Sequence, residues 1–153
     1  MNYLQKNLPA KASEMLIGAL LRVPSEAIHR RIVHDLNAAG FEGISLPHLA
    51  VLRYPGPDGV RPTVLAERAG MSKQAMNRLL GSLEELGYLV RSSAPDEGRA
   101  RIVRFTDRGH AAWKKVLDVL REIEREWQTE LGAKDLSQLK RLLFRVLKSP
   151  LIG

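Results

Sequence analysis

Apolar residues recur every three or four positions over most of the chain, so we predict a mainly α protein. Two short runs, residues 88–93 and 101–105, break this pattern and are rich in residues that favour strands. The turn residues Asp96-Glu97-Gly98 lie between them, so the three segments together predict a single β-hairpin. An isolated hairpin is only marginally stable in water, and we therefore expect this one to pack against the helices.

The N-terminal part of the sequence predicts a long helical segment over residues 10–39. Pro24 lies inside this segment and cannot donate a backbone hydrogen bond, so we expect a kink or a break there, with Ser25 restarting the helix. A short helix over residues 46–54, with a proline in its first turn, and a loop over residues 54–59 follow.

The next two predicted helices are separated by a tight turn. The first runs from Pro62 to Gly70, and glycine tolerates the positive φ that such a turn requires. Ser72 is a preferred N-cap for the second helix, residues 73–87. This second helix has an apolar stripe and a polar face. The stripe consists of Met76, Leu79, Leu80, Leu83 and Leu86, and the polar face of Lys73, Gln74, Asn77, Arg78 and Ser82.

A helix-turn-helix binds DNA through the N-terminal part of its second helix, and the side chains there are of the kinds that read base edges. Gln74 and Asn77 can each pair with adenine, and Lys73 and Arg78 can bind guanine or phosphate. The first amides of the helix capped by Ser72 would point at a phosphate or a base edge. The same pattern also fits an ordinary helical hairpin with a solvated polar face.

The predicted hairpin is basic, and this favours DNA binding over the ordinary helical hairpin. A basic tip can enter the minor groove, where narrow A·T tracts concentrate negative potential on an inserted arginine. Asp96 or Glu97 would then pair with Arg99 and hold the tip in shape. The alternative is a solvated hairpin whose surface ion pairs contribute about 0 to 1 kcal/mol each. The arginines are Arg91, Arg99, Arg101, Arg104 and Arg108.

Two further helices are predicted after the hairpin, over residues 107–131 and 135–149. The outer helical segments that flank the compact centre have apolar stripes wider than so small a core requires, which suggests that a second copy of the chain completes the burial. We therefore divide the chain into N-terminal dimerisation helices (1–40), a winged helix-turn-helix DNA-binding domain (41–108) and C-terminal dimerisation helices (109–153). The basic residues of the last helix are interpreted as a solvated face rather than a DNA contact.

The overall composition agrees with a nucleic-acid partner and gives no sign of catalysis. Lys and Arg number 24 against 17 acidic residues, a net charge of +7 that attracts polyanions. Cysteine is absent, which excludes disulfides and thiol chemistry. The four histidines are scattered, and no phosphate loop, nucleophile motif or carboxylate pair is present, so we expect no metal, no cofactor and no enzyme. Without an apolar run of about 18 residues or a secretory signal, we expect a cytoplasmic protein with no membrane partner.

Three segments, residues 65–75, 83–88 and 98–109, resemble the MarR family of bacterial winged-helix regulators. They read Leu-Ala-Glu-Arg-Ala-Gly-Met-Ser-Lys-Gln-Ala, Leu-Glu-Glu-Leu-Gly-Tyr and Gly-Arg-Ala-Arg-Ile-Val-Arg-Phe-Thr-Asp-Arg-Gly. The resemblance is close over residues 40–110, and the flanking helices match in order and length. The family has an aspartate two residues before the wing arginine; here that position is Glu97, and Asp96 precedes it.

The resemblance implies a homodimer with interleaved terminal helices and one winged helix per lobe. Its recognition helices would enter successive major grooves of a pseudo-palindromic operator, and its wings the flanking minor grooves. Thr63, at the start of the preceding helix, would donate to a phosphate, and Arg99 would be the minor-groove arginine, with Arg101 beside it in the wing. Many members are repressors that a small, often phenolic ligand releases from DNA. The recognition-helix positions would be Ser72, Lys73, Gln74, Asn77 and Arg78.

Two hypotheses follow for the function. The first is a homodimeric, sequence-specific regulator of transcription. It would be a repressor, and a small aromatic ligand that binds between the lobe and the dimer helices would relieve the repression. Trp113 is expected near the opening of such a pocket, although both tryptophans are first interpreted as core or dimer contacts. The second is a winged-helix module that binds another protein and has no specific DNA site. The basic wing argues against the second hypothesis.

Overall fold

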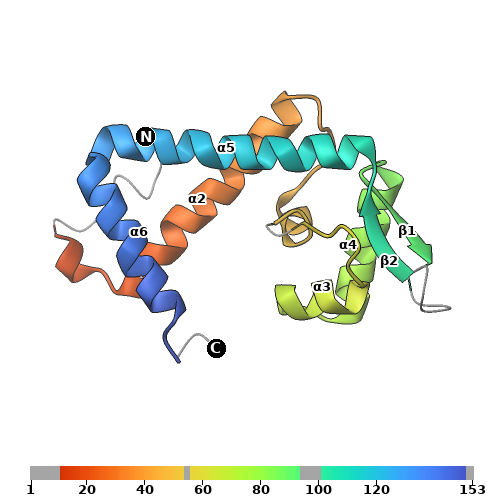
Figure 1. Cartoon of the computed structure of the whole chain (residues 1–153), viewed down its shortest axis with the longest axis horizontal. Helices are drawn as coiled ribbons and strands as arrows, with labels where there is room; N and C mark the ends of the chain where they lie inside the picture. The colour runs from red at the N-terminus through yellow and green to blue at the C-terminus, as the bar shows by residue number, and fades with distance from the viewer. Residues whose placement is uncertain (1–10, 54–55, 94–100, 151–153) are drawn as a thin grey trace.

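The computed structural model describes residues 11–53, 56–93 and 101–150. A long helix, α5, runs along the top of the molecule in Figure 1, with a compact lobe beneath one end and α6 folded back at the other. The elements in chain order are η1 (Ala12–Glu14), α2 (Ile17–Ala38), η2 (Leu46–Ala50), α3 (Pro62–Ala69), α4 (Lys73–Glu85), β1 (Leu89–Ser93), β2 (Arg101–Phe105), α5 (Asp107–Leu131) and α6 (Ala133–Leu147). The prediction of a mainly helical winged helix-turn-helix is confirmed.

The helix α2 packs against α5 and differs from its prediction in two respects. It begins at Ile17 rather than near residue 10, because Ala12–Glu14 form a separate 3-10 turn. It is also continuous through Pro24, so of the two expected outcomes, a kink or a break, the break does not occur. Proline removes one backbone hydrogen bond, and the packing of the rest of α2 against α5 compensates for that local loss.

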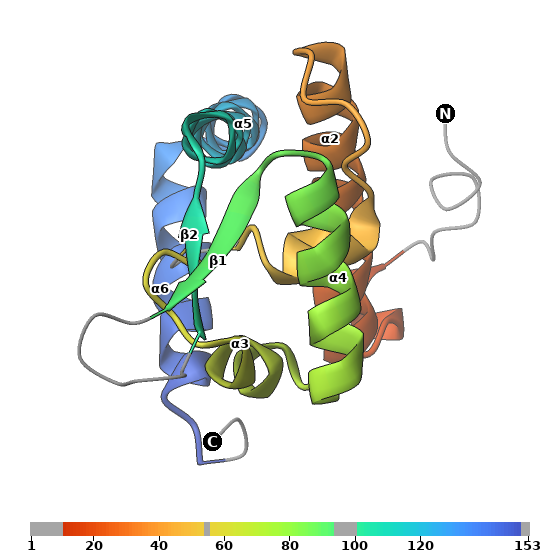
Figure 2. The ribbon, with the colours of Figure 1, turned by 90° about the vertical axis from the view of Figure 1, so that its right-hand side faces the viewer.

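The lobe follows the predicted order of helix, turn, helix and hairpin (Figure 2). Strands β1 and β2 pair antiparallel, with Leu89 opposite Phe105 and Ser93 opposite Arg101. Val60, just before α3, forms a bridge with Val103, so the hairpin is anchored to the helix-turn-helix. The short helix predicted over residues 46–54 is a 3-10 helix of five residues, because Pro47 and the hydrogen bonds around Ser45 favour a tight turn.

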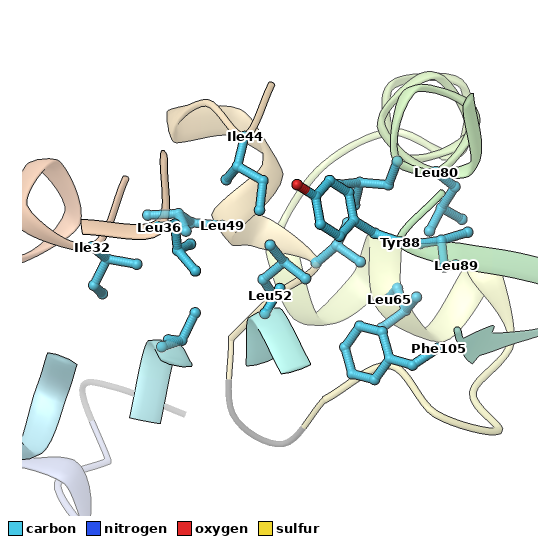
Figure 3. Packing of buried hydrophobic residues seen from close by; sticks show 14 of the residues in the cluster. Ile32, Leu36, Ile44, Leu49, Leu52, Leu65, Leu80, Tyr88, Leu89 and Phe105 are labelled. Carbon is cyan, nitrogen blue, oxygen red and sulfur yellow. The ribbon is translucent and has the colours of Figure 1, made fainter. Parts of the chain in front are cut away.

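One apolar core fills the lobe and continues between α2 and α5 (Figure 3). Met76, Leu80 and Leu83 of α4 are wholly buried, as the predicted stripe requires. The first turn of α5 fits tightly against the start of the hairpin. A Cβ atom on Gly109 would lie 1.8 Å from the carbonyl oxygen of Tyr88, so only glycine allows this approach.

The opposite end of the molecule is much less buried. Helix α6 has Leu136 as its only buried residue, while several of its large apolar side chains face solvent. The same is true of the N-terminal half of α2. A groove of about 560 Å³ runs between α2, the end of α5 and α6. The exposed apolar residues at this end are Leu16, Ile17, Leu21, Leu131, Leu139, Leu142, Phe144, Val146 and Leu147.

Candidate nucleic-acid interface

The turn between α3 and α4 is built as the sequence predicts. Gly70 ends α3 in the left-handed conformation, with φ of 62°. Ser72 then caps α4, since its hydroxyl accepts a hydrogen bond from the Ala75 amide at 3.1 Å. No acidic residue lies in the first turn of α4, so the positive end of the helix dipole is left for an anion.

The five residues predicted for base and phosphate contacts come together on the solvent-facing side of α4. Each is exposed, whereas Met76 and Leu80 on the opposite side are wholly buried. Thr63, near the start of α3, is also exposed. The arrangement therefore presents two hydroxyls, two amides and two cations from adjoining helices to solvent. The five are Ser72, Lys73, Gln74, Asn77 and Arg78.

Arg91 does not belong to the basic surface that the sequence suggested. Its Nε and Nη2 donate to the Glu84 carboxylate at 3.0 and 2.8 Å, and its amide donates to the same group at 3.1 Å. These hydrogen bonds from Arg91, against a smaller opposing effect of burial, hold the pKa of Glu84 below its ordinary value. Arg91 therefore ties β1 to α4, because hydrogen bonds between a guanidinium and a carboxylate are charge-assisted and stronger than neutral ones.

Arg108 is exposed but also makes contacts within the lobe. Its guanidinium lies 4.7 Å from the centre of the Tyr88 ring, and its Nη2 donates to the Tyr88 hydroxyl at 3.2 Å. Arg101 and Arg104 remain exposed on β2. Arg99, together with Asp96 and Glu97, lies outside the described residues, so the predicted contact at the hairpin tip stays a prediction.

A buried histidine lies next to α4, and the scattered distribution of the four histidines along the sequence gave no sign of it. His48 of η2 is only 6% exposed, and its Nε2 lies 3.0 Å from the Ser82 hydroxyl of α4. Its Nδ1 lies 3.1 Å from the Ser45 amide and closes a capping box around η2. Burial lowers the pKa of His48 below its ordinary value. The spacing Ser45-x-x-His48 was the available signal, because capping boxes have a side-chain acceptor at this position.

A cavity of about 130 Å³ lies between the lobe and the helices α2 and α5. Trp113, Val116 and Leu120 of α5 form one wall, as the expectation of a pocket near Trp113 requires. Leu49 and Leu52, in and just after η2, form another, and His29 and Arg53 also line it. The cavity is therefore mainly apolar, with two groups able to bind an anion.

The described ranges contain no group of three or more side chains suited to hold a metal ion. In the same ranges, no helix combines the length and the apolar character that crossing a bilayer requires.

The fold and the exposed face of α4 define the chain as a winged helix-turn-helix protein, and comparisons with known proteins identify its family. A family model described as the MarR family matches residues 42–100. HTH-type transcriptional repressors from Mycobacterium tuberculosis (Rv2887) and Mycobacterium bovis (Mb2911) are each 31% identical over 102 residues, which cover 66% of this chain and 73% of the relative.

Solved structures agree with this assignment. The crystal structure of the MarR family protein Rv2887 of Mycobacterium tuberculosis in complex with salicylic acid matches with a TM-score of 0.64 and 27% identity, over 89% of this chain and 99% of the other. Wild-type MarR from E. coli, in its apo form, shares the fold, with a TM-score of 0.68 and 20% identity over 87% and 98% of the two chains. The chain belongs to the MarR family of transcriptional regulators.

Proposed function

We propose that this protein is a homodimeric, sequence-specific DNA-binding repressor of transcription that a small aromatic ligand releases from its operator. It would act in the cytoplasm, where the chromosome is, without catalysis or a cofactor. The domain division into 1–40, 41–108 and 109–153 belongs to the same proposal. The observation that carries it is the exposed polar face of α4, which starts at a capped helix end, in a lobe whose strand β2 also exposes Arg101 and Arg104.

The exposed face would act through two kinds of contact. Lys73, Arg78 and Thr63 would bind phosphates, which supplies most of the affinity and makes it fall with salt. Gln74 and Asn77 would contribute discrimination between bases, about 1–3 kcal/mol for each good bidentate pair. A contact within the lobe orients the Asn77 side chain. Its Oδ1 lies 3.5 Å from Arg91 Nη1 and therefore faces the hairpin.

A second copy of the chain is the proposed occupant of the apolar groove between α2, α5 and α6. Single chains rarely expose so continuous an apolar surface, and a twofold interface of this kind would bury it. Two lobes related by a twofold axis would bind half-sites about 34–36 Å apart, which requires a pseudo-palindromic operator. The dimer is thus needed both for burial and for recognition.

The cavity beside Trp113 is the proposed ligand site. Its volume of about 130 Å³ is comparable to the roughly 150 Å³ cavity that holds benzene in an engineered protein. Arg53 and His29 would offer positive charge to an acidic substituent. The relative Rv2887 was crystallised with salicylic acid, so salicylate is the first probe to use.

Selection from a random pool of DNA duplexes tests the DNA-binding part of the proposal. We expect the protein to enrich a pseudo-palindromic motif, with Gln74→Ala relaxing the preference at one position of each half-site. Gln128→Ala, an exposed change near the far end of α5, is the matched control and should select the same motif as the wild type. Recovery of DNA with no shared motif would instead favour the second hypothesis, a winged-helix module that binds protein.

The hairpin tip is tested separately. Arg99→Ala should weaken binding and reduce the preference for A·T pairs flanking the half-sites, because narrow minor grooves attract arginine. Arg101→Ala should weaken binding with a smaller effect on the flanks, as for a phosphate contact. Unchanged affinity and flank preference in both variants would contradict the role of the wing.

Fluorescence tests the ligand site, because the chain has only two tryptophans. Trp127→Phe leaves Trp113 as the sole indole, and salicylate should then quench its emission and reduce DNA binding over the same concentration range. Quenching without loss of DNA binding would contradict the proposed release of the operator.

A further inference from the structure

The 3-10 helix η2 lies between the proposed ligand cavity and the recognition helix α4. Leu49 in η2, and Leu52 and Arg53 directly after it, line the cavity. His48, from the same turn, bonds in another direction, to Ser82 on α4. Ser82 lies on the same helix as Gln74 and Arg78, so this bond constrains the helix that would carry the base contacts.

The hydrogen bonds of His48 determine which of its nitrogens carries the proton. The Ser45 amide is a donor and lies 3.1 Å from Nδ1, so Nδ1 must accept. In the neutral ring the proton is therefore on Nε2, which donates to the Ser82 hydroxyl at 3.0 Å. A second proton on Nδ1 would oppose the N–H of the Ser45 amide and break that hydrogen bond of the capping box, leaving the Ser45 hydroxyl, 3.1 Å from Nδ1, as the acceptor for the proton.

An imidazole is an unusual choice at this position of a capping box, where Glu or Gln is normal. A carboxylate would supply an acceptor only, whereas neutral histidine supplies an acceptor to its own turn and a donor to α4. Glutamine offers the same two functions through its amide and has no pKa in the accessible range. The difference between histidine and glutamine at residue 48 is therefore chiefly the ability to take up a proton.

We propose that His48 is a positioning residue for DNA binding. Its neutral ring holds α4 in the orientation that binds DNA, and its protonation in mild acid lowers the affinity for the operator. The proposal rests on the proposed DNA-binding function. It would make the protein sensitive to pH through a buried contact rather than through the exposed face of α4.

The surroundings of His48 favour the neutral ring. Burial alone lowers its pKa below the ordinary 6.5, with no charged partner contributing. The acids on the packed helices have other partners, since Asp35 of α2 binds Arg31 and Glu84 of α4 binds Arg91. The cavity walls from α5 are apolar. The segments next to η2 and the two helices packed against it, α2 and α4, carry further charged or titratable groups, among them Glu42, Arg53, His29, His34, Arg78 and Glu85.

DNA affinity measured from pH 8 to pH 5.5 in wild type and His48→Gln tests the proposal, using fluorescence anisotropy with the selected duplex. We expect nearly equal affinity at pH 8, because glutamine keeps both hydrogen bonds. At pH 5.5 the wild type should bind about tenfold more weakly than His48→Gln, the usual scale of one buried hydrogen bond lost. Parallel pH profiles for the two proteins would overturn the proposal.

Two further variants separate this role from general effects of acid. His34→Gln removes an exposed histidine of α2 and should keep the wild-type profile, since its ring contacts Asp35 rather than η2. Ser82→Ala leaves the capping box intact and should weaken binding already at pH 8; wild-type affinity in this variant would also overturn the proposal. Melting curves at each pH show at which pH values each variant is folded, and affinities are compared only at those values. A wild type that selects no DNA motif at pH 8 would refute the proposed function itself, a result distinct from these.

Discussion

The lobe and the outer helices of this protein differ in how completely a single chain buries their apolar residues. In the lobe, Leu80, Leu83 and Tyr88 are wholly buried, and the core is closed by contacts within the chain. At the other end, Ile17 is 68% exposed and Phe144 57%, although both lie on well-formed helices. The lobe therefore buries its apolar residues within one chain, whereas the outer helices leave an apolar surface that the proposed second copy of the chain would cover.

The largest effect is expected where that second copy would pack. Leu139→Asp places a carboxylate in the groove next to Trp127, and both subunits of a dimer would carry it. Because an unpaired buried charge is costly, the dimer dissociation constant should rise more than about a thousandfold. Analytical ultracentrifugation measures the change. Gln138→Asp, one residue earlier and exposed, is the matched control and should remain dimeric, and a dimeric Leu139→Asp variant would show that the groove is not the interface.

A change in the core of the lobe should act differently. Leu83→Ala removes a wholly buried side chain and should lower the free energy of unfolding by about 2–5 kcal/mol. Leu142→Ala on α6, at a position 44% exposed, should cost less than about 1 kcal/mol when introduced into the monomeric Leu139→Asp protein. Chemical denaturation gives both values. Similar losses in the two variants would contradict the contrast between lobe and outer helices.

The elements of the lobe were predictable because their signals are local. The cap at Ser72, the turn at Gly70 and the stripe through Met76 each depend on residues within one or two turns. The continuity of α2 through Pro24 was not predictable in this way, because packing against a helix some 90 residues later offsets a local defect. Local sequence therefore specified the helices and strands better than it specified how a long helix ends or continues.

The candidate site shows the same division between local and distant signals. Periodicity placed Gln74 and Arg78 on an exposed face, and the structure agrees. It gave no means of telling Arg91, which binds Glu84, from the exposed Arg104, or of seeing that the exposed Arg108 also stacks on Tyr88. The link between His48 and Ser82 joins residues 34 positions apart, and only the folded chain brings them together. A count of basic residues thus overstates the charge available to DNA.

A smaller, pH-dependent effect is expected from the ion pair that joins β1 to α4. Because the pKa of Glu84 is lowered from its ordinary 4.5, the folded state favours the ionised form more than the unfolded state does. The stabilisation is therefore complete above about pH 4.5 and is lost as the pH falls through the lower folded-state pKa. With the carboxylate 35% exposed, we expect no more than about 1 kcal/mol at neutral pH.

Denaturation of wild type and Glu84→Gln at pH 7 and pH 3.5 measures this contribution. Glu84→Gln should be the less stable protein at pH 7, and the difference should shrink at pH 3.5. Glu85→Gln, the adjacent exposed carboxylate, serves as the control and should follow the wild type at both values. An equal loss at both pH values would mean that Glu84 contributes through packing rather than charge.

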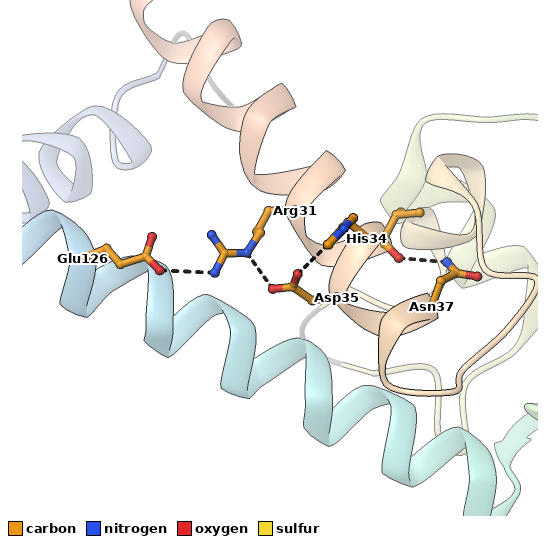
Figure 4. A network of polar contacts seen from close by, with 6 residues as sticks. Arg31, His34, Asp35, Asn37 and Glu126 are labelled. Atoms are coloured by element: carbon orange, nitrogen blue, oxygen red, sulfur yellow. Dashed lines mark hydrogen bonds and ion pairs between the residues drawn. The ribbon is translucent and has the colours of Figure 1, made fainter. Parts of the chain in front are cut away.

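The smallest effect is expected midway between the two regions, where Arg31 of α2 reaches Glu126 of α5 (Figure 4). The Arg31 Nη2–Glu126 Oε1 distance is 3.2 Å, but the two side chains are 41% and 56% exposed, so solvent and salt screen the pair. Glu126→Gln should lower the free energy of unfolding by about 0.5 kcal/mol or less at low salt, and by less still at high salt.

The apolar packing beside this ion pair provides the contrast. Ile32, adjacent to Arg31, is 4% exposed, and Ile32→Ala should cost about 2–5 kcal/mol at either salt concentration. If Glu126→Gln lowered the free energy of unfolding as much as Ile32→Ala, the ion pair rather than apolar packing would hold α2 on α5. The expected disparity, at least about fourfold, instead means that the core of the lobe extends along α2 and α5 until the apolar residues reach the face that the proposed second copy would cover.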